Sequence, residues 1–360
     1  MLDIKEILGR AVEKGASDIH INVELPPIVR KNTELVELDF PIITDEIAKQ
    51  MVIDMVGEER FKIFEENRDL DFSTKIANGC RFRVNAHYQR DTIALSFRAI
   101  PSEIPEIEDL HLPPIVKELT DLPRGLVLVT GHTGSGKSTS LAAMVGVINR
   151  KYKKRIITLE DPVEYALSNR RSMIEQREIG FDCPDFTCGL KHVLRQDPDI
   201  IMVGEMRDLE TTSSTITAAE TGHLVFSTLH TVNAPQTIER IIDIYPSGQQ
   251  SQIRTMLANT LQAVISQTLF KRVDQPGMVP CTEILLCTSA VRNCIRENRI
   301  YEIPNIIETS RRLGMQSMDH SIADMYGNGF IDREEAVTRS NNPGKMDKIL
   351  AESNMACEVA

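Results

Sequence analysis

Apolar and polar residues follow two different patterns along this chain of 360 residues, and the change lies near residue 100. Before it, apolar residues recur at helical spacing from Leu2 to Val12 and again within residues 43–66. Strand-like alternation of apolar and polar residues marks four short segments: residues 17–23, 69–75, 81–89 and 93–100. We therefore predict a small α+β domain over residues 1–100, in which the last three of these segments form an antiparallel meander.

A proline-rich segment follows this domain. Residues 101–124 include Pro101, Pro105, Pro113, Pro114 and Pro123. Such a composition is typical of a connector between domains, and we predict a linker here with a short helix inside it.

From Gly125 onward, short β-branched runs alternate with helical stretches as far as HLVFSTLH at residues 223–230. This alternation predicts an α/β domain over residues 125–289, with a parallel sheet covered by helices. Beyond it the pattern is helical and more polar, which predicts a helical C-terminal subdomain and tail over residues 290–360.

Composition and charge exclude several classes of protein. The net charge of −11 argues against nucleic acid as the main partner, because phosphate neutralisation needs a basic face. No segment approaches the ~18–20 apolar residues of a membrane span, and the charged N-terminal segment does not resemble a signal peptide. We expect a cytoplasmic protein that associates with the membrane only through partners.

Two segments have a weak likeness to metal sites. Cys281, Cys287 and Cys294 lack the tight pairing of structural zinc sites, which favours packing of these thiols in the core. The segment DMYGNGFIDREE at residues 324–335 nearly matches a calcium loop, but Tyr326 occupies a ligand position. A turn followed by a helix with Asp332 as its N-cap is the favoured interpretation.

The sharpest motif is GHTGSGKS at residues 131–138, which follows an apolar run and precedes a helical stretch, as a P-loop requires. Its glycines let backbone N–H groups turn inward toward phosphate oxygens. Lys137 would neutralise the β- and γ-phosphates, and the Ser138 hydroxyl would hold Mg²⁺. We therefore predict that ATP and Mg²⁺ bind here, with the phosphates held by Gly131, Thr133, Gly134, Ser135, Gly136, Lys137, Ser138 and Thr139.

Carboxylates end two of the predicted parallel strands, where ligands bind in open α/β sheets. Glu205 ends DPDIIMVGE, and Gly204 before it stands where many P-loop ATPases have an aspartate, so we expect Glu205 to contact Mg²⁺ through water. Asp199 lies at the start of the same strand, far from the phosphates. A second cluster, Glu160, Asp161 and Glu164 in TLEDPVE, could polarise the attacking water, although an acidic loop ended by Pro162 is an alternative.

Two histidines, His223 and His230, bracket the strand HLVFSTLH. Their spacing does not suit a shared metal. Because the strand is expected beside the nucleotide site, we predict that both sense the γ-phosphate.

Four segments together identify a family. GHTGSGKS, TLEDPVE, LRQDPDIIMVGEMRD and TAAETGHLVFSTLHT closely resemble the Walker A, acidic, Walker B and histidine boxes of the type II/type IV secretion ATPases. The resemblance extends to residues 15–30 and 81–89, which look like the family's N-terminal domain, and thus covers nearly the whole chain.

Within the family, AVRNCIREN at residues 290–298 and GMQSMD at residues 314–319 look like C-terminal elements of the type IV pilus retraction ATPases. The four-cysteine metal loop that is usual in the assembly and type II secretion members is missing. Two departures stand out: His132 replaces a usual proline, and Cys294 interrupts a usual apolar run.

The resemblance implies a RecA-like P-loop domain, a PAS-like N-terminal domain and a homohexameric ring. ATP would lie between one subunit's P-loop domain and its neighbour's N-terminal domain. By the same resemblance, Glu164 would be the general base and Glu205 the Walker B carboxylate, while His230 and, less directly, His223 would couple nucleotide to the ring. The arginines that match phosphate-approaching arginines of the family are Arg81, Arg83, Arg98 and Arg240.

For each arginine, a surface ion pair is the alternative. The implied partners are an inner-membrane pilus platform protein and a paralogous motor, at the inner face of the cytoplasmic membrane. Rival functions are an accessory motor, or a pilus assembly or type II secretion ATPase. A non-hydrolysing nucleotide-dependent scaffold and a nucleic-acid translocase are rivals from other classes, disfavoured by the intact site residues and by the acidic charge respectively.

Overall fold

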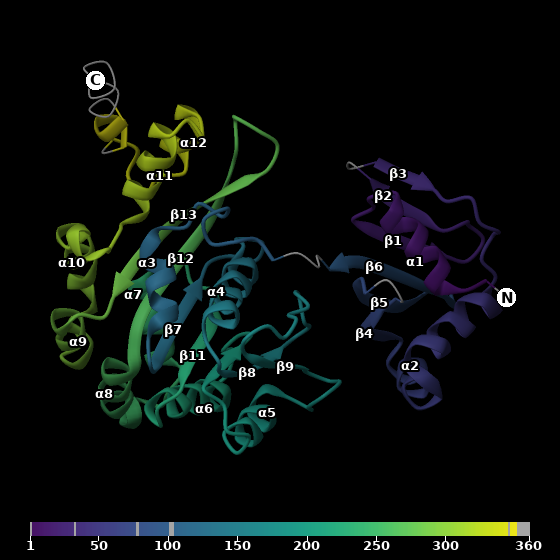
Figure 1. Ribbon diagram of the computed structural model, residues 1–360, viewed down its shortest axis with the longest axis horizontal. Helices are drawn as coiled ribbons and strands as arrows, with labels where there is room; N and C mark the ends of the chain where they lie inside the picture. Colours follow the sequence, from purple (N-terminus) through teal and green to yellow (C-terminus); the bar gives the residue numbers. More distant parts are fainter. Residues whose placement is uncertain (1, 32–33, 77–78, 101–103, 345, 351–360) are drawn as a thin grey trace. The chain divides into compact units, whose positions relative to one another are not determined.

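The computed structural model describes residues 2–31, 34–76, 79–100, 104–344 and 346–350 (Figure 1). The chain divides into two compact units, Met1–Glu103 with Pro162–Ala166, and Ile104–Asp161 with Leu167–Ala360. Across the described ranges, no helix is both long and apolar enough to cross a bilayer.

The first unit is a six-stranded antiparallel sheet with strand order β3-β2-β1-β6-β5-β4. Its helices and strands are α1 (Ile4–Glu13), β1 (Asp18–Asn22), β2 (Ile28–Lys31), β3 (Glu34–Glu37), α2 (Asp45–Asn67), β4 (Asp69–Lys75), β5 (Arg81–Gln89) and β6 (Thr92–Ile100). Consecutive pairing of β4, β5 and β6 confirms the predicted meander. The apolar sides of α1 and α2 pack with alternate strand residues into one core.

Helix α2 is two helices joined at Gly57, whose φ of +79° lies in the left-handed region that favours glycine. The chain turns there, so that Lys49 of the first half meets Glu65 of the second at 3.4 Å. The ammonium group of Lys49 also lies over the ring of Phe61. This turn lets one sequence segment cover a wide part of the sheet.

The second unit contains a seven-stranded sheet with strand order β13-β12-β7-β11-β10-β8-β9, in which only β13 is antiparallel to its neighbour. Its elements up to β13 are α3 (Pro114–Glu118), β7 (Gly125–Thr130), α4 (Lys137–Lys151), β8 (Arg155–Glu160), β9 (Met173–Glu178), α5 (Phe186–Val193), β10 (Ile200–Val203), α6 (Leu209–Glu220), β11 (Leu224–Leu229), α7 (Ala234–Asp243), α8 (Gln250–Thr260), β12 (Leu261–Lys271) and β13 (Met278–Leu286). The predicted fold class, a P-loop α/β unit preceded by a smaller α+β unit, is confirmed.

Helices cover both faces of this sheet. Along β7, Leu126 and Leu128 face one core with α6, α7 and α8, whereas Val127 and Val129 face another core with α4. Every residue of β7, β10 and β11 is buried. The P-loop therefore starts from the middle of a rigid sheet.

The C-terminal segment is helical, as predicted, with α9 (Ser289–Arg296), α10 (Ile303–Thr309), α11 (Met318–Gly327) and α12 (Arg333–Thr338). Asp332 is the N-cap of α12 and accepts the N–H of Glu335 at 2.7 Å, which confirms the turn-and-cap interpretation of residues 324–335. Cys281, Cys287 and Cys294 are buried, the first in a different cluster from the other two, which confirms core packing. Burial raises the pKa of both Cys281 and Cys287 to about 12, so these thiols stay protonated.

The expected linker of residues 101–124 is, from Ile104 onward, part of the second unit. Its apolar side chains pack with α4 in one core: Ile107, Leu112, Val116 and Leu119. The short helix expected inside it is α3. Periodicity over so short a segment could not show that these apolar residues are buried against a helix further along the chain.

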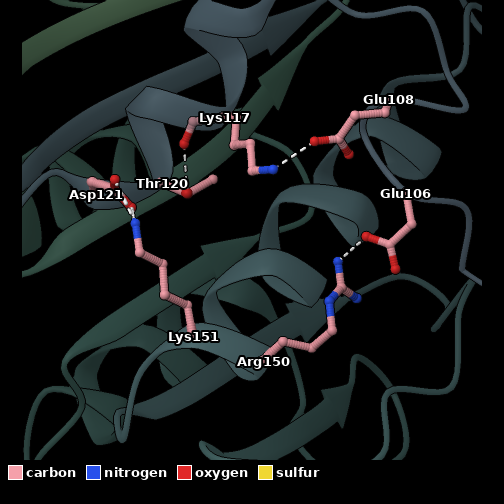
Figure 2. Close-up of polar contacts among 7 residues, drawn as sticks. All are labelled: Glu106, Glu108, Lys117, Thr120, Asp121, Arg150 and Lys151. Atoms are coloured by element: carbon pink, nitrogen blue, oxygen red, sulfur yellow. Dashed lines mark hydrogen bonds and ion pairs between the residues drawn. The ribbon is translucent and has the colours of Figure 1, made fainter.

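Ion pairs also hold this segment on the second unit (Figure 2). Glu106 pairs with Arg150, and Asp121 pairs at 2.7 Å with Lys151, both at the C-terminal end of α4. The hydrogen bond from Lys151 is the main cause that lowers the pKa of Asp121. The cations also suit the negative end of the helix dipole. The far end of the P-loop helix is thus tied to the segment that enters this unit.

Candidate nucleotide site

The loop between β7 and α4 has the geometry of a phosphate cradle. Gly131, Gly134 and Gly136 have φ values of +142°, +78° and +85°. Residues with a side chain rarely adopt these values, because their Cβ atom clashes with the backbone. A Cβ on Gly131 would lie 2.3 Å from the carbonyl oxygen of Gln267, and one on Gly136 would lie 2.7 Å from its Nε2. Both the conformation and the close approach of β12 therefore require glycine at these two positions.

The polar side chains of the loop include groups that can donate hydrogen bonds to an anion. Lys137 is buried, and its Nζ donates to the carbonyl oxygens of Gly131 and His132, each at 2.9 Å. The Oγ of Ser135 is buried and, among the described residues, has no hydrogen-bond partner. Thr133 is exposed, while Ser138 and Thr139 are half-buried in the first turn of α4. These groups suit a phosphate site. The Ser135 hydroxyl could donate to a phosphate oxygen, and the Lys137 ammonium group could form charge-assisted hydrogen bonds with one.

Glu205 and His230 meet at the same edge of the sheet, since β10 and β11 are parallel neighbours. The Oε2 of Glu205 lies 3.3 Å from Nε2 of His230, and its Oε1 lies 2.5 Å from Nη2 of Arg207. The side chain of Glu205 is only 11% exposed, and the guanidinium of Arg207 compensates the charge of this largely buried carboxylate. Gly204 before it approaches the backbone closely: a Cβ there would lie 3.2 Å from the carbonyl oxygen of Leu159.

The three carboxylates after β8 have different surroundings. Glu160 is buried and accepts hydrogen bonds from Thr158 at 2.6 Å and Gln176 at 2.9 Å, which holds it within the sheet. Asp161 and Glu164 are exposed. Glu164 lies in Pro162–Ala166, the segment that belongs to the first unit. Of the three, only Asp161 and Glu164 have carboxylates that are exposed to solvent.

His223 lies at the other edge of the sheet from the P-loop. Its carbonyl accepts the N–H of Gly125 at the start of β7, and its Nδ1 lies 2.9 Å from the carbonyl oxygen of Ala218. A strand the length of β11 spans roughly 20 Å, so only His230 is at the phosphate edge. The prediction that both histidines sense the γ-phosphate of this loop needs correction for His223. Sequence spacing puts the two histidines at opposite ends of one strand, but it does not show that those ends lie at opposite edges of the sheet with respect to the P-loop.

Asp199 is also at the edge away from the P-loop, as predicted. It accepts hydrogen bonds from Nζ of Lys154 at 2.7 Å and from the N–H of Arg155 at 2.8 Å. Those contacts occupy its carboxylate at the start of β10, away from any metal held by Ser138.

The first unit presents a row of charged residues on the sheet face away from its core. Arg81 and Arg83 point to the same side of β5, because Phe82 between them and Val84 after them are buried, and this confirms the predicted alternation. Arg83 is directly opposite Arg98 on β6. Arg98 is in turn opposite Asp18 on β1, and its Nε donates to that carboxylate at 2.9 Å.

Two arginines opposite each other on neighbouring strands repel, a cost that a bound anion would remove. Arg81 donates to the Ser73 hydroxyl at 2.9 Å, whereas Arg83 is exposed. Arg240 is exposed on α7 in the second unit. Of the four predicted arginines, the sheet therefore brings together only the three of the first unit.

One residue near the site gave no signal in the sequence. Glu283 on β13 accepts the N–H of Ala234, the first residue of α7, at 2.8 Å. This bond fixes the start of the helix that follows His230. Burial, and to a smaller extent the nearby carboxylate of Asp319, raises the pKa of Glu283.

We expect Glu283→Gln to stabilise the second unit increasingly as the pH rises. An acid whose pKa is raised in the folded state is penalised when it loses its proton, so wild-type stability falls above the unfolded pKa, whereas glutamine keeps the acceptor without the charge. Melting temperatures between about pH 5 and pH 8 should show a gap between variant and wild type that widens with pH. Glu239→Gln, at an exposed site on α7, is the control and should follow wild type. A gap of constant size would contradict the assignment.

The described ranges contain no group of three or more histidine, cysteine, aspartate or glutamate side chains that could hold a metal ion. At a P-loop, Mg²⁺ takes hydroxyl, phosphate and water oxygens as ligands. Such ligands suit this ion, which usually keeps several waters.

Comparisons with known proteins cover most of the chain. The model of the family described as Type II/IV secretion system protein matches residues 1–337. The Type IV pilus retractation ATPase PilT of Pseudomonas aeruginosa is 42% identical over 342 residues, covering 95% of this chain and 99% of the relative. The Type IV pilus ATPase PilU of the same organism is 36% identical over 341 residues, covering 95% and 89% respectively.

Among solved structures, a crystal structure of the pilus retraction motor PilT with bound ADP superimposes with a TM-score of 0.89 and 42% sequence identity, covering 97% of this chain and 100% of that one. The likeness therefore includes both units, not the P-loop unit alone. This chain belongs to the Type II/IV secretion system protein family.

Proposed function

We propose that this protein is a homohexameric ATPase motor that drives type IV pilus retraction, and thereby pilus disassembly and twitching motility, by Mg²⁺-dependent ATP hydrolysis. The observation that carries the proposal is 42% identity to the PilT relative over 95% of this chain, with an intact P-loop in the shared region. The 36% identity to PilU makes an accessory motor the second candidate. A pilus assembly or type II secretion ATPase and a non-hydrolysing scaffold are less favoured.

The loop's own geometry supports phosphate binding. Its positive-φ glycines, the buried Ser135 hydroxyl and the ammonium group of Lys137 fit an anion of the size of the β-phosphate. The N-terminus of α4 adds a favourable field. Ser138 would hold Mg²⁺ directly and Glu205 would hold it through water, and the bound ion would supply positive charge to offset the charge that develops on the phosphates.

Residues of both units have roles in the proposed reaction. Lys137 would move from the loop carbonyls to the phosphates, and Glu164 would accept a proton from the attacking water. His230, held by Glu205, would report the presence of the γ-phosphate to the rest of the unit. Arg81, Arg83 and Arg98 of a neighbouring subunit would approach the phosphates, and Arg240 would contribute from α7. By the family resemblance, His223 at the opposite edge of the sheet would also couple the nucleotide to the ring.

Because ATP and ADP would differ in affinity for closed and open interfaces, successive closures around the ring would do work on a partner. That partner would be a platform protein of the inner membrane, with a paralogous motor as a second one. The motor would then lie in the cytoplasm at the inner face of that membrane, without nucleic acid as a partner.

Deletion of the gene in its host tests the proposal. We expect pili to remain on the surface while retraction and twitching stop, because assembly would continue without disassembly. Re-expression of the wild-type protein should restore retraction, and expression of Lys137→Ala should not. Loss of surface pili would instead indicate an assembly motor, and unchanged retraction would indicate an accessory motor.

A further inference from the structure

Strand β12 carries a buried glutamine beside the P-loop, Gln267, which belongs to no recognised motif. β12 pairs with β7 in parallel, and the register places Ser266 opposite Thr130, the last residue before the loop. The hydroxyl of Thr130 donates to that of Ser266 at 2.9 Å. The next residue, Gln267, is 3% exposed and faces the loop itself.

The side-chain amide of Gln267 uses both of its ends on the P-loop region. Its Nε2 donates to the carbonyl oxygen of Ser135 at 2.8 Å. Its Oε1 accepts the hydroxyl of Ser140 at 2.8 Å. Because Lys137 lies between these two contacts in the sequence, one amide holds the chain on both sides of the phosphate-binding lysine.

The same residue forms the wall against which the loop glycines are packed. Its carbonyl oxygen faces Gly131 and its Nε2 faces Gly136, at distances that leave no room for a Cβ on either. The first and last glycines of the motif therefore both contact Gln267. The loop therefore packs against both the side chain and the backbone of Gln267.

The bond to Ser135 also sets the direction of a backbone donor. In a trans peptide the C=O and the following N–H point in opposite directions. With the Ser135 carbonyl turned toward Gln267, the N–H of Gly136 points away from it, to the side of the loop where a phosphate oxygen would be bound. Loss of the bond would free this peptide to rotate and would remove one preset donor.

We propose that Gln267 is a positioning residue of the nucleotide site, which presets the P-loop for phosphate through Ser135 and Ser140. The proposal rests on the proposed ATPase function and concerns the same site. It assigns to β12 a part in nucleotide affinity that no motif of the sequence indicates.

Gln267→Met tests this, since methionine has a similar length and makes neither hydrogen bond. We expect the dissociation constant for ADP to rise about 10- to 100-fold, because the buried carbonyl and hydroxyl lose their partner. KM for ATP should rise in parallel, while kcat at saturation should fall less than about fivefold, because bound phosphate restores the loop. Binding of a fluorescent ADP analogue and steady-state phosphate release by the full-length protein measure both.

The matched control is Gln262→Met on the same strand. Gln262 packs against Gly125, at the other end of β7, and accepts a hydrogen bond from Arg292 at 3.0 Å. That variant should lower the melting temperature and leave ADP affinity within about twofold, because it is remote from the loop. Ser140→Ala should weaken ADP binding about three- to tenfold. Combined with Gln267→Met it should add less than its separate effect, because both substitutions remove the same hydrogen bond between Ser140 and Gln267.

An ADP affinity within about twofold of wild type in Gln267→Met would overturn the proposal. If that variant does not fold, Ser140→Ala decides, and unchanged affinity there would also overturn it. Wild-type protein that binds neither ADP nor ATP would contradict the proposed function itself, and with it the role of Gln267.

Discussion

We expect Lys137→Ala to weaken nucleotide binding at least about 100-fold and to remove measurable ATP turnover. A 100-fold loss corresponds to about 2.7 kcal/mol, within the range of a hydrogen bond to a charged group. Lys137 is buried in the loop, where its ammonium group contacts the carbonyl oxygens of Gly131 and His132. In phosphoryl transfer the corresponding lysine offsets charge on the β- and γ-phosphates, and hence both binding and chemistry depend on it.

Lys151→Ala is the matched control, because it removes a lysine from the other end of α4. Lys151 is about half exposed and pairs with Asp121 rather than with the loop. Such a surface pair contributes little to stability, and the variant should bind and hydrolyse ATP like wild type. Titration with a fluorescent nucleotide and a phosphate-release assay measure the two effects. Turnover above about a tenth of wild type in Lys137→Ala would contradict the proposed chemistry.

The parts of the fold that sequence could predict are those encoded by local pattern. The P-loop is a run of eight residues with glycines where positive φ is needed, and its strand and helix are adjacent in the chain. The meander of the first unit follows from the alternation over β5 and over residues 95–98 of β6. Such features need no knowledge of distant partners, because the side-chain period itself decides which face is buried.

Features that depend on distant partners were missed. Gln267 contacts Ser135, which is 132 residues earlier, and nothing in SQTLF marks a glutamine as buried against a glycine loop. Edge strand β9 reads MIEQRE, a polar sequence that forms a strand through its pairing with β8. In β3 all four residues are exposed, so no alternation marks it as a strand.

The hairpin of β12 and β13 was missed for a related reason. Both strands are buried on two faces over most of their length, so they lack the alternation that marks a half-buried strand. The strands extend beyond the parallel core and carry the C-terminal helices on their far end, around Phe270, Val279 and Cys281. Figure 1 shows the hairpin as the longest pair of strands in the second unit. A buried helix would have given a similar composition.

The strand edges explain why His230 and His223 differ although both flank one strand. In a parallel sheet all strands end at the same edge, so His230 meets Glu205 after the neighbouring strand β10. His223 meets instead the start of β7, with Asp199 at the start of β10 on the same edge. The sequence positions of the two histidines show which one lies at the P-loop edge only when the sheet is known to be parallel.

Glu164→Gln should retain ATP binding and lose turnover by at least about 100-fold, the lower limit of a general-base contribution. Glutamine has the shape of glutamate but cannot accept a proton from water. Glu164 is exposed, whereas Glu160 accepts from Thr158 and Gln176 inside the sheet. Phosphate release and nucleotide titration should separate the two effects, and Asp161→Asn, at an exposed carboxylate three residues earlier, is the control that should keep turnover.

Glu205→Gln tests whether Glu164 or Glu205 is the general base. Both oxygens of Glu205 already have partners, the guanidinium of Arg207 and the ring of His230, whereas Glu164 is exposed and open to water. Its substitution should therefore alter the response to Mg²⁺ and the coupling through His230, with raised Mg²⁺ restoring part of the turnover. In Glu164→Gln, raised Mg²⁺ should restore nothing, because the missing group is a base. Wild-type turnover in Glu164→Gln together with a Mg²⁺-independent loss in Glu205→Gln would transfer the role of base to Glu205, at the end of the strand beside the P-loop.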